Sequence, residues 1–519
     1  MKNKFLKISI AASFLVSLST LNVACNNDTL EEKEYKGAFA GDNFFRNEQE
    51  CFFGLVGTYD VMRKYAGGFE NMVTFFNAAS DDFYAGGGSA TDGAGIQGAS
   101  SFQINPNTMP ASYWKDYYQG IARANALILN APNASMDETL KQRFIAEAKT
   151  LRAMYYFELL RVFGNIPLIL KPFEATDDFY NVPQVAPAQV YAQIEKDLNE
   201  ALPHLPMTVS GEQNGRLTQG AAKALLGKVY LYENKKAEAA AQFADVNGTP
   251  GGTSQYGYKL LANYDDLWKA GVALGGTADP YEFTSESIIE ASHSDQGKSD
   301  WGFWGQGKDE GNSICVMTAP RSYTRVLQPI PANNAPDVVS GWAFNTITTD
   351  LFNFIQNDPR VNSTVLNMNT LKAQNKADYA PAYKDTGYFL NKFMPTSDKK
   401  STLGVTELNY RQNYMVIRLA DTYLMEAEAL NGTGSRAQAL LDAVRARVGL
   451  ASVPVSMQAI KDERRRELAG EGHRFFDLVR WGEAPTKLAS KGFVAGKNEI
   501  MPIPLTELTG TILKQNPGY

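Results

Sequence analysis

The chain has 519 residues, of which 44% are hydrophobic and 20% charged, so it holds enough apolar material for a large core. Its 50 lysines and arginines stand against 56 acidic residues, without a basic block. That balance argues against a nucleic-acid partner, because such binding depends on clustered positive charge. Three histidines and three cysteines argue against a zinc site, a disulfide scaffold and most histidine-based chemistry.

The first 24 residues have the pattern of a secretory signal. Three lysines precede a mostly apolar stretch at 8–21, and Ala24 stands directly before Cys25. The stretch is short for a bilayer span, so an uncleaved anchor is the weaker alternative. A cysteine after a small residue is typical of a bacterial lipoprotein signal, although Asn22 occupies the place where such signals usually have leucine. We expect 1–24 to be the signal peptide and Cys25 to carry the lipid.

The segment after Cys25 is polar and rich in acidic residues, which predicts a solvated tether over 25–40. No later run reaches ~18 consecutive apolar residues, the length that a membrane-spanning helix needs. The remainder is therefore expected to be held to a membrane by its lipid alone.

Helical periodicity dominates two parts of the mature chain. Apolar residues recur at spacings of three and four at about 112–163, about 187–234 and about 412–449, and the last stripe starts at Ile417. Helix-start signals accompany them at Ser135 or Asp137, Pro187, Thr218 and Ser435. Paired helices with small residues at their crossings resemble tetratricopeptide units, which must stack to bury their apolar faces. The sequence predicts a mainly α fold with tetratricopeptide-like hairpins as its scaffold.

Between about 235 and 410 the pattern changes, because Gly, Ser, Asn, Asp and Pro interrupt nearly every apolar run. We expect short helices here, such as one at 349–356, but no long helical stripe. A compact domain rarely carries so much irregular chain without a functional reason. Four of the six tryptophans lie in this region: Trp268, Trp301, Trp304 and Trp342. Cys51 and Cys315 lie in apolar surroundings and are expected to be free, buried thiols.

A highly charged helical segment at 462–468 leads through two glycines into an aromatic run at 475–482. Glu463 and Glu467 share one helix face, with Arg466 nearby. We interpret the segment as a structural set of arginine–carboxylate pairs over an aromatic cluster. An anion or phosphate site at the glycines is the weaker alternative, because no predicted strand precedes them.

The 462–482 segment closely resembles the signature of the SusD/RagB family of surface lipoproteins. Further segments resemble other parts of this family in the same order: 114–125, 147–168, 418–429, 501–504 and 515–519. The resemblance implies an N-terminal SusD-like helical region at 41–234 and a C-terminal RagB/SusD region at 235–519, packed together as one globular unit. It also implies irregular loops that carry the ligand contacts.

The same resemblance implies an outer-membrane lipoprotein that faces the cell exterior. Such a protein captures oligo- or polysaccharide and delivers it to a SusC-like TonB-dependent transporter, over which it acts as a lid. A peptide-binding member of the family is the alternative. Neither the particular ligand nor the stoichiometry with the transporter follows from the sequence.

A sugar binder needs flat aromatic faces and short polar groups that reach hydroxyls. The glycine-rich stretch at 299–310 offers both through Trp301 and Trp304, unless one of them plugs the loop into the core. The stretch at 81–88 is the second candidate, with Tyr84 as its aromatic. The remaining candidate ligand contacts are Asp81, Asp82, Arg321, Tyr323 and Trp342.

We expect no catalytic residues and no cofactor. A glycoside hydrolase is the weaker alternative. It needs two carboxylates about 5–9.5 Å apart around one bond, and Asp81, Asp82, Asp309 and Glu310 could be arranged in that way, but the sequence does not place them. The histidines lie in unrelated contexts with no nucleophile motif nearby. A structural calcium ion at the paired acids is the one metal that the sequence leaves open.

Overall fold

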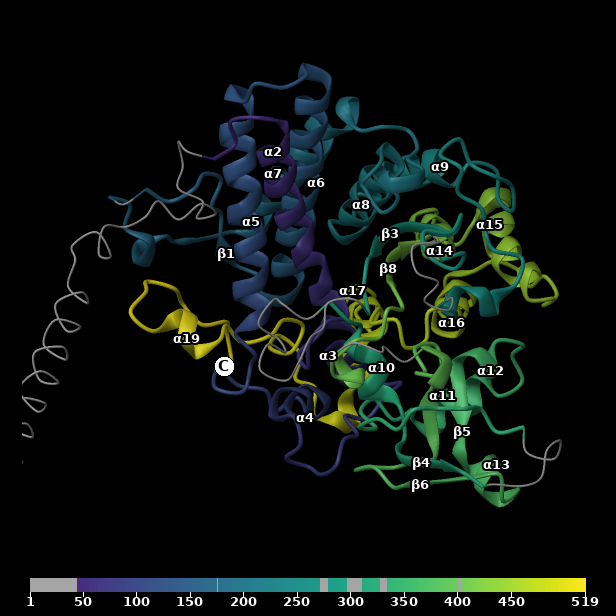
Figure 1. Ribbon diagram of the computed structural model, residues 1–519. Helices are drawn as coiled ribbons and strands as arrows, with labels where there is room; N and C mark the ends of the chain where they lie inside the picture. Colours follow the sequence, from purple (N-terminus) through teal and green to yellow (C-terminus); the bar gives the residue numbers. More distant parts are fainter. Residues whose placement is uncertain (1–43, 175, 271–278, 296–309, 327–333, 400–403) are drawn as a thin grey trace, which may run out of the picture.

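The computed structural model describes residues 44–519 apart from 175, 271–278, 296–309, 327–333 and 400–403 (Figure 1). The expected signal peptide, Cys25 and tether therefore lie outside the described residues, as do Trp301 and Trp304. The described chain is mainly α-helical, as predicted, with a few short strands.

Four helices pack against one another as a bundle and form the N-terminal part of the scaffold (Figure 1). They are α2 (Glu48–Tyr59), α5 (Ser112–Asn130), α6 (Glu138–Phe163) and α7 (Pro187–Ala201). Asp137 caps α6 by accepting a hydrogen bond from the amide of Leu140, and Gly164 follows the last residue of α6 at φ +71°. The predicted hairpin at 112–163 is thus α5 and α6.

A second group of helices packs around α14 (Figure 1). It contains α8 (Gln219–Tyr232), α9 (Lys236–Asn247), α14 (Leu419–Ala429), α15 (Gly434–Arg447) and α16 (Met457–Glu467). Thr218 caps α8 as predicted. The prediction missed α9, whose alanine-rich sequence has no clear stripe, and it placed the cap of α15 at Ser435 instead of Thr433. Ile417 was also assigned wrongly, because it lies in a strand that pairs before α14 begins.

Shorter helices connect the longer ones. They are α3 (Met72–Ala79), α4 (Ala94–Ser101), α10 (Ser313–Thr318), α11 (Thr349–Ile355), α12 (Val361–Thr364), α13 (Met368–Ala373), α17 (Arg474–Arg480), α18 (Ala484–Lys487) and α19 (Leu505–Leu508). Of these, α4, α11, α12 and α13 lie in the lower part of the molecule in Figure 1. The short helix predicted at 349–356 is α11.

Among the described residues, the strands form antiparallel pairs: β1 with β2, β3 with β8, β4 with β6, and β5 with β7. Their bounds are β1 (Ile166–Pro167), β2 (Gln184–Val185), β3 (Ser287–Ala291), β4 (Arg321–Arg325), β5 (Val365–Asn367), β6 (Ala377–Ala380), β7 (Tyr388–Leu390) and β8 (Tyr414–Arg418). The β3–β8 ribbon joins segments that are far apart in the sequence, since β3 lies inside the irregular region and β8 follows it.

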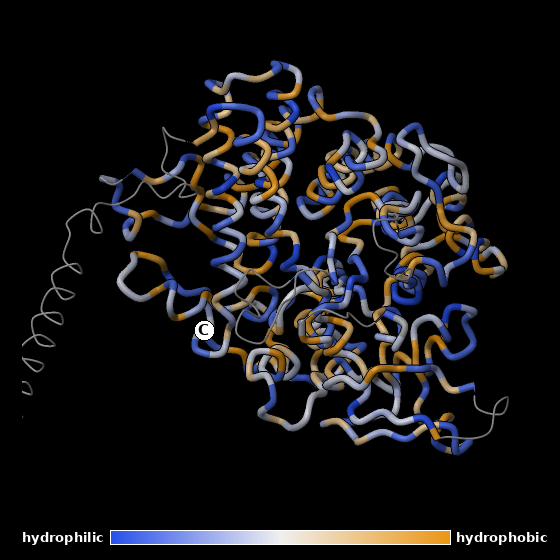
Figure 2. The backbone as a smooth tube through the Cα atoms, in the orientation of Figure 1, coloured by the Kyte–Doolittle hydropathy of each residue, from blue (hydrophilic) through white to orange (hydrophobic). Residues whose placement is uncertain are grey.

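The largest hydrophobic cluster runs through the whole described chain, from Phe45 to Ile503, so the N- and C-terminal regions share one core. Hydrophobic and hydrophilic residues alternate along the scaffold helices, as expected where one face of each helix is buried (Figure 2). Within the described part of the chain, no helix is both long and apolar enough to cross a membrane. Cys51 and Cys315 are buried free thiols, as predicted.

Candidate functional site

The structure brings together two segments that the sequence singled out separately. The stretch after α3 runs antiparallel to 343–347, with isolated bridges between Phe83 and Ile347 and between Gly86 and Phe344. The amide of Tyr84 donates to the carbonyl of Thr346 at 2.9 Å. At Gly86 the backbone has φ +70°, and a Cβ atom would lie 2.2 Å from the carbonyl oxygen of Ala343, so only glycine allows this approach.

Partly exposed aromatic and charged side chains surround the stretch 84–93, and we call this set the loop face. Its members are Phe69, Tyr84, Asp92, Arg321, Trp342 and Lys384. Beside it opens a hollow of about 550 Å³ that Phe69 and Gly93 share with Leu505 of α19. That volume lies within the range of ligand-binding pockets.

The two aromatic candidates of the loop face are held differently. Trp342 packs against Phe69, with ring centroids 6.2 Å apart, and its amide donates to the carbonyl of Val316 in α10. Tyr84 is half-buried, and the ammonium group of Lys384 lies 5.4 Å from its ring centroid. Each ring keeps a partly exposed surface.

Arg321 supplies a guanidinium group that water reaches. Its side chain is 38% exposed, and Nη1 lies 3.9 Å from Oδ2 of Asp92. The same guanidinium group lies against Gly88, where a Cβ atom would be 2.9 Å from Nη1. An exposed cation with one distant partner retains donors for a further contact.

Tyr323, also on β4, is directed into the structure. It belongs to a second hydrophobic cluster, and its hydroxyl donates to the carbonyl of Pro336 at 2.6 Å. Burial raises the pKa of this phenol to about 12. The structure therefore gives Tyr323 a supporting place beneath β4, while its neighbour Arg321 lies at the surface.

Asp81 and Asp82 are bound by arginines from the C-terminal part of the chain. Both oxygens of Asp81 accept from Arg474 at 2.8 Å, and Oδ1 of Asp82 accepts from Nε of Arg465 at 2.8 Å. Burial raises the pKa of Asp82; at Asp81 the effect of burial is outweighed by Arg474, and the pKa is lowered. These contacts fix the turn that precedes Tyr84.

A lysine that the sequence did not single out completes this turn. Nζ of Lys491 donates to the carbonyls of Ala78, Ser80 and Phe83 at 2.8, 2.5 and 2.6 Å. Burial lowers the pKa of Lys491 to about 7. No local pattern could have identified it, because its nearest bonded partner lies 408 positions away in the sequence.

The described residues on either side of Trp301 and Trp304 lie close to each other and near the loop face. The amide of Ser294 donates to the carbonyl of Glu310 at 2.8 Å, so the two ends of this stretch lie together. The chain then enters α10, whose residue Met317 accepts through its carbonyl from the amide of Phe344. The stretch that carries the two tryptophans is thus followed by a helix that packs beneath the loop face.

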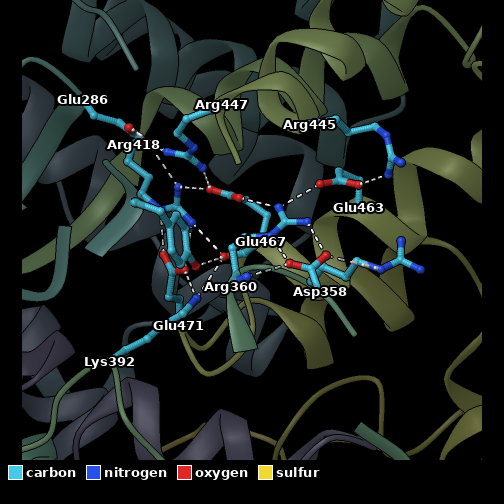
Figure 3. A network of polar contacts seen from close by, with 12 residues as sticks. Glu286, Asp358, Arg360, Lys392, Arg418, Arg445, Arg447, Glu463, Glu467 and Glu471 are labelled. Atoms are coloured by element: carbon cyan, nitrogen blue, oxygen red, sulfur yellow. Dashed lines mark hydrogen bonds and ion pairs between the residues drawn. The ribbon is translucent and has the colours of Figure 1, made fainter. Parts of the chain in front are cut away.

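The charged segment at 462–468 forms the centre of a buried ion network (Figure 3). The labelled members are Glu286, Asp358, Arg360, Lys392, Arg418, Arg445, Arg447, Glu463, Glu467 and Glu471. Glu467 is fully buried and bonds with Arg418 and Arg360, each at 2.6 Å, and with Arg447. Burial alone would raise the pKa of Glu467, but these three guanidinium groups hold it well below its usual range.

Each carboxylate among the labelled members has a cationic partner, which matches the predicted structural role. Arg466 takes less part than the sequence suggested. It is 24% exposed, and its nearest carboxylate, Asp358, lies at 3.9 Å. Arg464 is buried instead and binds Asp477 and Asp421 at 2.9 and 2.7 Å. Helical spacing in the sequence shows which residues share a helix face, but it does not show which face other segments of the fold cover.

No group of three or more metal-ligating side chains occurs among the described residues. The pair Asp81 and Asp82, where the sequence left a calcium ion open, instead has arginine partners.

Comparison with known proteins identifies the class to which this architecture belongs. A family model described as "SusD family" matches 341–499, and one described as "Starch-binding associating with outer membrane" matches 28–231. A solved structure titled "Laminarin binding SusD-like protein" is 57% identical and superposes with a TM-score of 0.87, covering 91% of this chain and 100% of its own. The chain belongs to the SusD family, as its sequence motifs predicted.

Two further relatives extend the comparison. Surface glycan-binding protein A from Bacteroides thetaiotaomicron, solved in complex with laminarihexaose, is 25% identical with a TM-score of 0.76, over 91% of this chain and 99% of its own. SusD-like protein P2 of Formosa agariphila is 25% identical, over 98% of this chain and 99% of its own. The similarity therefore covers nearly the entire described chain.

Proposed function

We propose that this protein captures an oligo- or polysaccharide at the outer surface of a bacterial outer membrane and delivers it to a SusC-like TonB-dependent transporter. The observation that carries the proposal is the 57% identity to a laminarin-binding SusD-like protein over 91% of this chain. Laminarin is accordingly the first ligand to test. Cys25 is the proposed lipid attachment site at the start of the tether, and the protein itself is proposed to face the cell exterior.

The loop face has the chemistry that sugar capture needs. Trp342 and Tyr84 provide aromatic faces for the C–H surface of a sugar ring. Arg321 and Asp92 provide a donor and an acceptor for hydroxyl groups at the same place. Trp301 and Trp304 are proposed to add further platforms, since the stretch that carries them leads directly into α10.

We propose binding without cleavage. The acids closest to Tyr84 in the sequence, Asp81 and Asp82, are bonded to Arg474 and Arg465. The pair of Asp81 is bidentate, and Asp82 is buried against Arg465, so both carboxylates support structure. Glycoside hydrolysis needs one carboxyl group able to give up a proton and a second that is free to act.

The direct test is calorimetry of the purified protein with laminarihexaose. Stacking on one aromatic is worth about 1–3 kcal/mol, so Trp342→Ala, Trp301→Ala or Trp304→Ala should each weaken binding by roughly fivefold to a hundredfold. Phe53→Ala is the matched control, because Phe53 is an exposed aromatic on α2, away from the loop face. Equal affinity in all variants would place the site elsewhere, and binding of peptides but of no glycan would favour the peptide-binding alternative.

Two further measurements address catalysis and attachment. Chromatography of laminarihexaose after long incubation should show no shorter products. Cys25→Ser should leave the protein unprocessed or release it from the outer-membrane fraction, because the acyl chains would be missing. Retention of that variant in the outer membrane would rule out the proposed anchor.

A further inference from the structure

A second hollow, of about 260 Å³, lies where the loop before α8 meets the segment that leads into β3. None of its lining residues belongs to the loop face. Its floor is formed by Tyr256 and Tyr258, which pack against α8 at Gly220. A Cβ atom at Gly220 would lie 2.6 Å from the ring of Tyr258 and 2.9 Å from that of Tyr256, so the missing side chain makes room for both rings.

Phe283 forms the wall of this hollow in an unusual backbone conformation. Its φ is +49°, which is rare for a bulky residue. The conformation is held by Glu290, whose two carboxylate oxygens both lie 3.1 Å from the amide of Phe283. The ring then lies against Gly215, where a Cβ atom would be only 2.7 Å away. Strained residues that the surroundings hold in place are concentrated at binding sites.

The charged side chains that line the hollow are already paired. The guanidinium group of Arg216 donates to both oxygens of Glu147 and to the side-chain oxygen of Gln213. Glu290 accepts from the side-chain amide of Asn413 at 2.7 Å as well as from Phe283. The hollow therefore offers no free charge to a ligand.

What remains available at the rim is uncharged and polar. Thr208 and Asn214 are exposed on one side, and Thr284 and Ser285 line the other. The hydroxyl of Ser285 donates to the carbonyl of Lys259 at 3.1 Å, which leaves its oxygen able to accept. Short hydroxyl and amide groups around aromatic faces form the combination that recognises a polyhydroxylated ring.

We infer that this hollow is a second binding site for one ring of a neutral sugar, separate from the loop face. The volume is slightly below the usual range for drug-sized ligands, which suits a single ring. The inference shares its ligand class with the proposed function but depends on different residues. A polysaccharide could then touch the protein at two places, which would raise its residence time without a tighter primary site.

Calorimetry with laminarihexaose tests this inference in three steps. The parent protein should bind at two sites. A variant in which alanine replaces Tyr84, Trp301, Trp304 and Trp342 together should retain one weaker site. Adding Thr208→Trp, which fills the mouth of the hollow, should weaken that remaining binding at least tenfold. Ser210→Trp is the matched control, because Ser210 is exposed in the same loop but does not line the hollow.

Phe283→Gly provides a second, independent variant. Glycine adopts a positive φ without strain, so the chain should fold while the aromatic wall is lost. It should weaken the remaining binding at least tenfold, as Thr208→Trp does, with an unchanged circular dichroism spectrum.

The outcomes separate this inference from the proposed function. Loss of all binding in the loop-face variant would overturn the second site and support the loop face. Residual binding that survives both Thr208→Trp and Phe283→Gly would overturn the location in the hollow. A parent protein that binds no laminarihexaose would overturn both proposals for this ligand.

Discussion

The ion network around Glu467 and the loop face around Tyr84 use the same kinds of charged side chain in opposite ways. In the network, Glu467 is fully buried and three guanidinium groups bind it. On the loop face, Arg321 is 38% exposed and its carboxylate partner lies at 3.9 Å. Water competes for the second pair and not for the first, so only the second can exchange its partner for a ligand.

The largest expected effect on stability comes from a substitution in the buried ion network. Glu467→Gln leaves Arg360, Arg418 and Arg447 buried with too little negative charge. Breaking one partner of a buried pair costs about 3–5 kcal/mol, and we expect a loss of that size in the free energy of unfolding measured with urea. Arg466→Ala is the control on the same helix and should cost at most about 1 kcal/mol, because its side chain is at the rim. Similar losses of unfolding free energy in both variants would contradict the distinction between the buried Glu467 and the partly exposed Arg466.

The second largest effect is expected on acidification, which should lower the free energy of unfolding through two buried histidines. Burial lowers the pKa of His293 and of His473 to about 4, whereas the unfolded chain titrates near 6.5. The unfolded state therefore binds more protons between pH 6.5 and 4, and stability should fall as pH falls through that window, by up to about 3 kcal/mol for each histidine. His473→Phe should flatten the dependence of the free energy of unfolding on pH.

Protonation of Glu282 should stabilise the folded state on acidification, which is opposite to the effect of the histidines and offers a control. Burial, with Asp279 and Glu290 nearby, raises its pKa to about 7, so the folded state holds a proton that the unfolded state releases between pH 4.5 and 7. Glu282→Gln should therefore make the loss of stability on acidification steeper. A flatter profile would show that the folded state does not raise the pKa of Glu282.

A smaller effect on stability is expected at Lys491, a partly buried residue that holds the turn before Tyr84 of the loop face. Lys491→Met removes the donor from three carbonyls of the turn before Tyr84, and an unpaired buried acceptor costs about 1–3 kcal/mol. Hydrogen exchange at 78–84 should become faster, with weaker laminarihexaose binding. Lys487→Met, an exposed neighbour on α18, should change neither property.

The smallest change in stability is expected at Arg321. Arg321→Ala should alter the free energy of unfolding by no more than about 0.5 kcal/mol, as is usual for surface positions. Binding of laminarihexaose should still weaken about threefold to tenfold through the lost donors. Arg325→Ala, on the same strand and 39% exposed, is the comparison. Unchanged binding with Arg321→Ala would remove this residue from the site.

Local patterns in the sequence predicted much of the scaffold and less of the site. The starts of α6, α7 and α8 follow from Asp137, Pro187 and Thr218, because a cap or a first-turn proline acts within one helical turn. Ile417 was assigned to a helix because an apolar residue fits either periodicity, and only pairing with β3 decides in favour of a strand.

The loop face depends on contacts between distant segments, which no local sequence pattern indicates. Composition showed that Tyr84 and Arg321 suit a ligand, but not that Gly86 and Phe344 would bring their segments together. Lys491 lies in an ordinary polar stretch, and its role follows only from the fold. Tyr323 and Arg321 lie two residues apart on one strand, yet the fold buries the first and exposes the second.

The contacts of Arg465, Arg474 and Lys491 with residues 78–83 impose an order of events during synthesis. Their partners are 383 to 413 positions earlier in the chain, so the turn before Tyr84 leaves the ribosome long before the side chains that close it. The early helices can form locally during that interval, because helix formation needs only near neighbours. A chain that ends before residue 465 would retain those helices and lack the closed turn. The complete polypeptide must therefore be present before this surface can assemble.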